Sequence, residues 1–469
     1  MKVMIAGAGP IGLATAMLLA REGWAVTVME KDANGPPAEP LEAWANWERP
    51  GVAQFRLPHF MMPRFRHLLD AEFPELIGAL ERFGARRVNL TEGLPRTLPD
   101  RSPKLGDERF QTLTARRPVL EAAFAAIAQD TPGIEIVRGV GVETPVAGAS
   151  VHPGIPHVVG VRTTRGEELS ADLVIDAMGR RSKLPEWLVG LGGGQVQEEA
   201  SDAGFAYYAR HFRAPDGRVP EHRGPIATVI GTFHALTILG DNDTWTVALA
   251  PMAGDAPLKA LRHREPWDRV ARSIPHVAPW AAGEPLTDVI VMAGVLDRYR
   301  RVAPGGTPLV TGLLPVGDAW ACTNPTAGRG VSMGLLQAIA LRDVLRECAD
   351  DPHETGVRFD AVTEEMVTPW YRDQVRRDRI RAAAIQAAVE GRPPDSNPDP
   401  ARQMQAAMLA AANVDPEVAR ASLDVLACLA LPSEVMARPG LAEKVRSFIG
   451  AEVPQLPGPT RAELLSLLN

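Results

Sequence analysis

The stretch Gly7-Ala8-Gly9-Pro10-Ile11-Gly12, close to the N-terminus, decides the fold of this chain. A short apolar strand is expected over Lys2–Ala6, a helix over Ile11–Arg21 and a second strand over Ala25–Met29. Glycines between a strand and a helix leave room for the backbone to approach a pyrophosphate. The N-terminal segment therefore predicts a dinucleotide-binding βαβ unit.

Each glycine of this unit has its own expected role. Gly7 allows the tight turn out of the strand, Gly9 lets the backbone approach the phosphates, and Gly12 lets the helix pack closely on the strand. The helix N-terminus adds free N–H groups and partial positive charge. Glu30, at the end of the second strand, can accept hydrogen bonds from both hydroxyls of an adenosine ribose and would repel the 2′-phosphate of NADP. These residues do not choose between NAD and FAD.

A second acid at a strand end indicates FAD. The apolar segment Pro308–Val316 predicts a buried strand that ends beside Asp318, and open α/β sheets bind ligands at such strand ends. A carboxylate there can accept hydrogen bonds from ribityl hydroxyls, which NAD lacks. Gly328 and Gly330 precede a helix expected over Ser332–Cys348. Its N-terminus would direct N–H groups at the flavin pyrimidine ring, which is negatively charged when the flavin is reduced.

With these motifs in this order, the chain resembles the FAD-dependent class A flavoprotein monooxygenases, the para-hydroxybenzoate hydroxylase-like family. The resemblance covers residues 1–350 or so and includes a central motif, Asp176–Ser182, which in the family contacts FAD and the NAD(P)H route. It implies an α/β fold: a Rossmann-like FAD-binding domain with an inserted antiparallel β-sheet substrate domain and a C-terminal helical region. The FAD-binding residues expected from the motifs and the resemblance are Gly7, Gly9, Gly12, Glu30, Arg49, Arg117, Asp318, Pro325, Gly328, Gly330, Val331 and Ser332.

Local patterns predict how the remaining chain is divided. Helices are expected over Leu68–Phe83 and Arg116–Asp130, and alternating strands flank a hairpin turn at Gly240–Asp243. Beyond about residue 355 the chain is helical, with a linker at Gly391–Pro400. The expected division is an FAD-binding domain (1–70, 108–185 and 288–350), a substrate-binding domain (71–107 and 186–287) and a C-terminal helical region (351–469).

The resemblance also implies a reaction. Reduced FAD would form a C4a-hydroperoxide with O2 and hydroxylate or epoxidise a small aromatic or polycyclic substrate. A phenolic substrate would benefit from a base. Polar candidates for the substrate pocket come from the inserted sheet and from an unusually aromatic stretch, Trp44–Arg66, and include His59, Tyr207 and Arg210.

The source of electrons stays open. The central motif contains Asp-Ala-Met-Gly where the family pattern is Asp-Gly, a form found in relatives that include epoxidases, halogenases and reductases. NADH, NADPH or reduced flavin from a separate flavin reductase are therefore all candidate donors. The alternatives to a single-component hydroxylase are a two-component oxygenase or epoxidase, a double-bond reductase, a halogenase, and a flavin-binding protein without turnover.

Composition restricts the class of protein. The 469 residues carry a net charge of -7 with acidic and basic residues interspersed, which argues against a nucleic-acid binder. Three scattered cysteines indicate neither a disulfide framework nor a metal site. No apolar run approaches the roughly 20 residues of a membrane helix. We expect a cytoplasmic enzyme, monomeric or homodimeric, whose partners are O2 and a small molecule.

Overall fold

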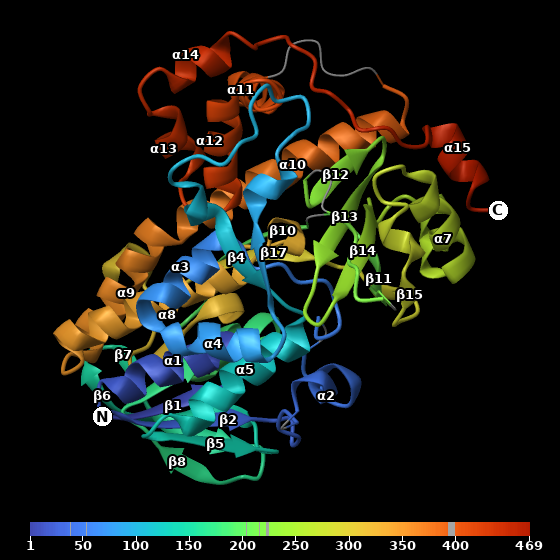
Figure 1. Ribbon diagram of the computed structural model, residues 1–469. Helices are drawn as coiled ribbons and strands as arrows, with labels where there is room; N and C mark the ends of the chain where they lie inside the picture. The colour runs from blue at the N-terminus through green and yellow to red at the C-terminus, as the bar shows by residue number, and fades with distance from the viewer. Residues whose placement is uncertain (38, 53, 203, 215, 222–224, 393–398) are drawn as a thin grey trace.

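The computed structural model describes residues 1–469 except 38, 53, 203, 215, 222–224 and 393–398. A parallel β-sheet with its helices forms the lower half of the molecule in Figure 1, and an antiparallel sheet lies at the upper right. Helices of the C-terminal region cover the top. The expected α/β fold with an added antiparallel sheet and a helical C-terminus is confirmed.

The first sheet is parallel, in the order β18 (Leu313–Pro315), β9 (Leu173–Asp176), β1 (Lys2–Ala6), β2 (Ala25–Glu30) and β5 (Ile134–Arg138). On one face lie the helices α1 (Pro10–Arg21), α5 (Arg117–Asp130) and α8 (Gly330–Cys348), and on the other the small sheet β6 (Val142–His152), β7 (Ile155–Thr163) and β8 (Glu168–Ser170). Val3 and Ile5 pack on the helical face, whereas Met4 and Ala6 pack on the other. Burial on both faces explains the continuous apolar run before Gly7.

The second sheet is antiparallel, in the order β12 (Ala227–Ile230), β13 (Phe233–Leu239), β14 (Thr244–Pro251), β11 (Tyr207–Arg213) and β15 (Glu284–Pro285), with β16 (Ile290–Met292) also paired to β11. The hairpin between β13 and β14 is confirmed: Gly240 N–H donates to the Thr244 carbonyl at 2.8 Å. Asn242 and Asp243 take φ values of 48° and 55°, which short polar residues tolerate. Helix α7 (Arg264–Ser273) packs on one face of this sheet.

Shorter elements connect the two sheets. They are the strand pair β3 (Arg86–Asn89) and β4 (Gln111–Thr114), the three-stranded sheet β10 (Gln197–Asp202), β17 (Leu296–Arg301) and β19 (Ala321–Cys322), and the helices α2 (Pro40–Ala45) and α6 (Leu184–Gly190).

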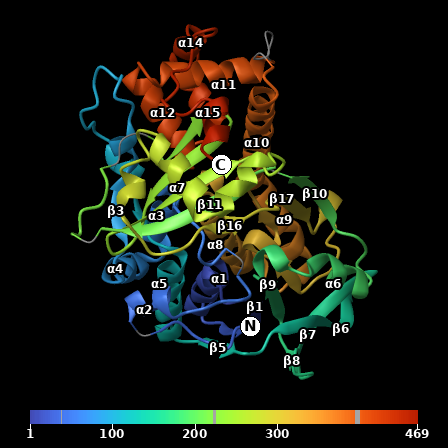
Figure 2. The same ribbon diagram turned by 90° about the vertical axis from the view of Figure 1, so that its right-hand side faces the viewer.

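The C-terminal region consists of α9 (Pro352–Met366), α10 (Thr368–Val389), α11 (Pro400–Ala411), α12 (Pro416–Leu426), α13 (Pro432–Met436), α14 (Leu441–Arg446) and α15 (Arg461–Ser466). Helices α11 to α14 share a small apolar core of their own. Figures 1 and 2 show α10 running from these helices toward β10 and β17, where Tyr371 donates to the Glu199 carbonyl at 3.5 Å. Most of the linker expected at Gly391–Pro400, namely 393–398, lies outside the described residues.

Two local predictions need correction. The helix expected over Leu68–Phe83 is two helices, α3 (Pro63–Glu72) and α4 (Pro74–Arg82). Phe73 between them has φ -141° and ψ 53°, because a proline at 74 disfavours helical backbone in the residue before it. The strand expected over Pro308–Val316 is only Leu313–Pro315, since Gly312 turns the chain with φ 75°.

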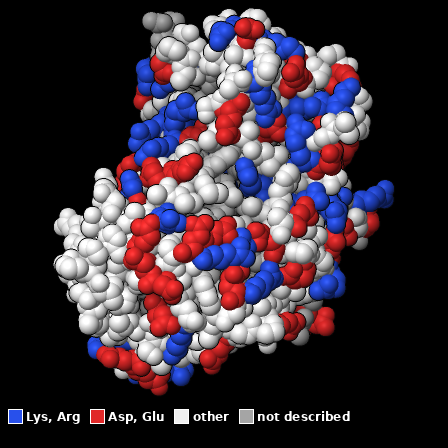
Figure 3. Space-filling view, turned by 90° about the vertical axis from the view of Figure 1, so that its left-hand side faces the viewer, with Lys and Arg blue, Asp and Glu red and all other residues white. Residues whose placement is uncertain are grey.

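The division into three domains stays a proposal, although all five parallel strands come from the ranges assigned to the FAD-binding domain. On the face shown in Figure 3, acidic and basic side chains alternate over short distances. No helix within the described residues is long and apolar enough to cross a membrane.

Candidate functional site

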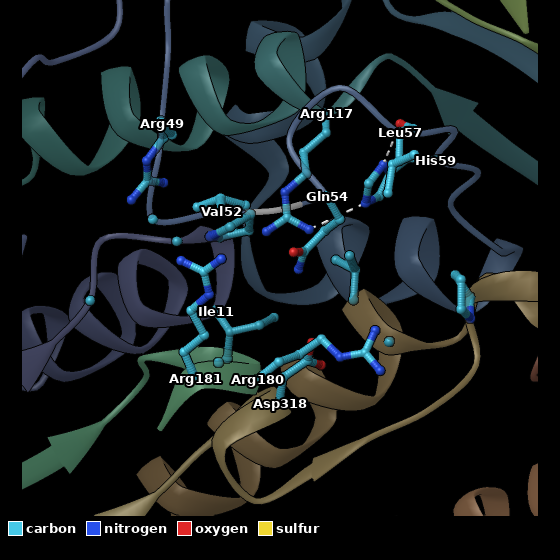
Figure 4. Close-up of a pocket in the computed structure, with 18 of the residues that line it drawn as sticks. Ile11, Arg49, Val52, Gln54, Leu57, His59, Arg117, Arg180, Arg181 and Asp318 are labelled. Atoms are coloured by element: carbon cyan, nitrogen blue, oxygen red, sulfur yellow. Dashed lines mark hydrogen bonds between the residues drawn. The ribbon is translucent and has the colours of Figure 1, made fainter. Parts of the chain in front are cut away.

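One cavity of about 480 Å³ brings the three glycine-rich motifs together with the antiparallel sheet. The first motif contributes Gly9 and Gly12, the central motif Met178, and the third motif Asp318 and Gly330. Figure 4 shows Ile11, Arg180, Arg181 and Asp318 on one side of the cavity, facing Arg117 and His59 on the other. Motifs far apart in sequence therefore form one continuous surface.

The glycines of the first motif fit a bound pyrophosphate. A Cβ on Gly12 would lie 2.1 Å from the Gly7 carbonyl oxygen, and one on Gly7 would lie 2.7 Å from the Ala177 oxygen. Both positions thus need glycine for packing. A Cβ on Gly9 would meet nothing within 4 Å, because Gly9 borders the open cavity. Helix α1 begins there without a side-chain cap, so its N-terminal N–H groups are available to an anion.

Glu30 lies at the carboxyl end of β2 and is buried. Its Oε2 accepts from the Ala8 N–H and its Oε1 from the Asp32 N–H, both at 3.0 Å. The Arg49 guanidinium also donates to Glu30 and reaches Glu121 of α5. Burial acts to lower the pKa of Arg49, but Glu121 and Glu30 outweigh it and raise that pKa above its ordinary value. Arg49 therefore holds Glu30, the acid of the expected ribose site, in place and links it to α5.

Arg117 and His59 form a linked pair on the cavity wall. The His59 ring contacts the Leu57 carbonyl through Nδ1 at 2.9 Å and Arg117 Nη1 through Nε2 at 3.2 Å (Figure 4). Burial, aided by the Arg117 charge, lowers the pKa of His59 to about 4. A neutral ring with its proton on Nδ1 satisfies both contacts. His59 then orients Arg117 and has no free lone pair to offer a substrate.

The third motif places its acid and its glycines on the cavity. Asp318 follows β18, and burial raises its pKa against the lowering effect of Arg180 and Arg117. Gly328 has φ 62°, and a Cβ there would lie 2.7 Å from the Phe60 carbonyl oxygen. Pro325, Gly328, Gly330 and Val331 line the cavity, as does Arg329.

The antiparallel sheet supplies an apolar wall with one hydroxyl. Tyr207 is buried at the start of β11, and its hydroxyl donates to Asn324 Oδ1 and also contacts Thr326 Oγ1. Burial raises the pKa of Tyr207 to about 12, so the phenol stays protonated. The apolar residues of this wall and of the neighbouring segment are Phe60, Met62, Ile226, Leu236, Ile238, Ala248 and Met292.

Comparison with known proteins agrees with this geometry. Residues 1–38 match the family described as FAD binding domain. Protein Rv3254 of Mycobacterium tuberculosis is 30% identical over 363 residues, which span 73% of this chain and 72% of that protein. The chain belongs to the same family as Protein Rv3254, and its N-terminal segment matches an FAD-binding domain. It is thus an oxidoreductase with FAD as its cofactor, for which NADH, NADPH or externally reduced flavin is a typical electron source.

Solved structures share the fold of this flavoprotein. PqsL of Pseudomonas aeruginosa, described as a probable FAD-dependent monooxygenase, aligns with a TM-score of 0.59 at 17% identity, covering 82% of this chain and 99% of PqsL. The anhydrotetracycline hydroxylase OxyS of Streptomyces rimosus aligns with a TM-score of 0.56 at 18% identity, covering 92% of this chain and 77% of OxyS.

Two sequence-predicted site residues of the flavoprotein do not line the cavity. Arg210 lies three residues after Tyr207 on β11 and therefore points to the opposite face of the sheet. There it pairs with Asp268 at 2.5 Å and packs on the Trp267 ring, so we withdraw it as a substrate contact. Ser332 is fully buried behind the cavity-lining residues, and its Oγ has no hydrogen-bond partner among the described residues.

Other residues at the site were not predicted from the sequence. Arg180 and Arg181 of the central motif line the cavity together with Lys183 just after it, and this run of basic residues was a visible signal. Asn324 and Thr326 hold Tyr207 and flank Pro325, so the third motif could have indicated them. No group of three potential metal-ligating side chains occurs in the part of the chain that the structure describes.

Proposed function

We propose that this flavoprotein is an FAD-dependent monooxygenase that hydroxylates or epoxidises an uncharged aromatic or polycyclic small molecule. The observation that carries the proposal is the cavity itself, which extends from the three flavin motifs to the apolar wall of the antiparallel sheet. The described residues that this sheet contributes to the lining are apolar apart from the Tyr207 hydroxyl. Ligand sites are commonly apolar with a few placed polar groups.

The flavin motifs would hold the cofactor. Gly7, Gly9 and Gly12 would admit the pyrophosphate, Glu30 the adenosine ribose, and Asp318 the ribityl chain. Arg49 and Arg117 would support this site through their contacts with Glu121, and Pro325, Gly328, Gly330 and Val331 would border the ring. When bound, FAD supplies the oxygen-activating chemistry, which side chains alone lack.

The side chains of this chain have positioning roles. The Tyr207 proton is donated to Asn324, and the Tyr207 oxygen, which also contacts Thr326, keeps a lone pair that can accept from a substrate hydroxyl or N–H. A phenol with a raised pKa is a poor base, so Tyr207 orients the substrate and does not deprotonate it. The apolar wall excludes water from the reacting groups, which protects the oxygenating reaction.

Ligand titration tests the substrate class. The FAD-loaded full chain is titrated with 1-naphthol and with 1-naphthoate, and binding is followed by the change in the flavin absorption spectrum. We expect 1-naphthol to bind at least tenfold more tightly, since a carboxylate would lose its hydration against an apolar wall. Equal or tighter binding of 1-naphthoate would contradict the proposed substrate class.

A second candidate is a two-component oxygenase or epoxidase that receives reduced flavin from a separate reductase. The Asp-Ala-Met-Gly form of the central motif favours it, because the family's NAD(P)H route involves this motif. NADH, NADPH and an added flavin reductase are compared in parallel for their rates of FAD reduction. Rapid reduction by a nicotinamide alone would exclude the two-component candidate, and reduction only with the reductase would support it.

A further inference from the structure

An arginine in the third motif is held by the C-terminal region. Arg329 lies between Gly328 and Gly330, lines the cavity, and has a side chain that is only 3% exposed. Its Nη1 donates to Asp373 Oδ2 at 2.9 Å, and its Cζ lies 5.3 Å from the centre of the Trp370 ring. Both partners belong to α10, so α10 fixes a buried positive charge beside the flavin motif.

The positive charge of Arg329 is only partly balanced. Asp373 also accepts from Arg376 at 3.2 Å and from Arg377 at 2.9 Å, so one carboxylate serves three guanidinium groups. Burial acts to raise the pKa of Asp373, but Arg377 and Arg329 outweigh it and hold that pKa below its ordinary value. Arg376 and Arg377 are 54% and 36% exposed, whereas Arg329 is buried at the cavity. Solvent therefore screens the first two charges far more than the third.

The position of Arg329 reinforces a second source of positive potential. Helix α8 begins at Gly330, immediately after Arg329, and has no side-chain cap at its N-terminus. The N-terminus of a helix carries partial positive charge, and a buried charge acts over a longer range than an exposed one. A flavin bound here gains negative charge when two electrons and one proton reduce it. The positive charge of Arg329 should therefore stabilise the reduced flavin more than the oxidised flavin.

We propose that Arg329, positioned by Asp373, raises the reduction potential of the bound FAD. The inference rests on the FAD site of the proposed function but not on the identity of any substrate. Asp373 acts through Arg329 and is a positioning residue. The pair thus gives the C-terminal helices a role in the redox chemistry of the flavin.

Reduction potentials test this inference without turnover. The FAD-loaded full-length chain and its R329M, R329K and D373N variants are reduced anaerobically with xanthine and xanthine oxidase in the presence of a reference dye. R329M should shift the reduction equilibrium about tenfold toward oxidised FAD, which is about 30 mV for a two-electron couple. D373N keeps the Arg329 charge and removes its counter-charge, so its potential should rise. R329K should stay near the wild-type value.

Potential shifts of opposite sign in R329M and D373N separate an electrostatic role from a structural one. A general loosening of the loop would shift the potential of both variants in the same direction. R420M is the matched control: Arg420 pairs with Asp107 at 2.8 Å, is similarly buried, and does not line the cavity. It should leave the potential unchanged. An unchanged R329M potential, or R329M and D373N shifts of the same sign, would overturn the inference. If R329M does not fold, the sign of the D373N shift decides. A wild-type chain that binds no FAD would instead overturn the proposed site.

Discussion

Arg49 and Glu30 form a buried ion pair at the carboxyl end of β2, and their side chains are only 2% and 6% exposed. The same guanidinium contacts Glu121, which is equally inaccessible. Arg49 follows α2 and Glu121 belongs to α5, so one side chain fastens the aromatic stretch to the FAD-binding sheet. The expected ribose acid is therefore part of a buried charge network that links β2 to α5.

Replacing Arg49 with methionine should destabilise the protein strongly. Glu30 and Glu121 would be left buried without their cation, and breaking such a pair costs about 3–5 kcal/mol. Urea unfolding of the full chain measures the loss. The matched control is R21M, because Arg21 pairs with Glu75 at the surface, where loss of the pair costs about 1 kcal/mol or less. A loss for R49M no greater than for R21M would show that the network is not needed.

Two glycines of the first motif should respond differently to alanine. In G12A the new Cβ meets the Gly7 carbonyl oxygen, so both folding stability and FAD affinity should fall. In G9A the Cβ meets no protein atom, so the melting temperature without FAD should stay unchanged while FAD affinity falls at least tenfold. Thermal unfolding and FAD titration give the two quantities. Normal FAD affinity in G9A would place the pyrophosphate elsewhere.

Removing the Tyr207 hydroxyl should weaken substrate binding selectively. Y207F deletes one hydrogen bond to a hydroxylated ligand, so 1-naphthol should bind about tenfold more weakly, equivalent to about 1.4 kcal/mol. FAD affinity should not change. Y208F is the control, since Tyr208 is the next residue on β11 and does not line the cavity. Equal 1-naphthol affinity in wild type and Y207F would remove Tyr207 from the substrate site.

Buried neutral histidines should make the protein less stable in acid. Burial lowers the pKa of His59 to about 4, below the ordinary 6.5, so the unfolded state binds the extra proton first. The stability contribution of a neutral His59 is complete above pH 6.5 and decreases as the pH falls toward 4. At pH 5 this loss is about 2 kcal/mol. H59Q should therefore lose less unfolding free energy between pH 7.5 and pH 5 than wild type, and identical losses would contradict the buried neutral state.

The strongest sequence predictions concerned local backbone chemistry. The turn at Gly7–Gly12 could be predicted because glycine is needed there for close packing within a few residues of sequence. The Gly240–Asp243 hairpin was predictable for the same reason, as its residues favour the required backbone angles. The break in the helix expected over Leu68–Phe83 could also have been predicted, because Pro74 lies within that segment. The prediction relied instead on the spacing of the apolar residues.

Other features depend on contacts between distant segments. The face to which Arg210 points follows from the register of β11 against β14 and β16, which the residues around Arg210 do not specify. Asp373 lies in a helix with no motif, and its importance appears only when α10 packs on the loop at Arg329. The C-terminal helices are also fixed by Arg64, whose guanidinium donates to the carbonyl of Cys428 at 2.7 Å. A sequence pattern within one segment cannot reveal such partners.

Oxygen labelling tests the central claim most directly. The FAD-loaded chain is reduced anaerobically with dithionite and then mixed with ¹⁸O₂ and a panel of uncharged aromatic and polycyclic compounds that includes 1-naphthol. This single turnover needs no assumption about the natural electron donor. Mass spectrometry should find a product carrying one ¹⁸O atom. Products that contain no ¹⁸O, or oxygenation confined to carboxylated compounds tested in parallel, would contradict the account.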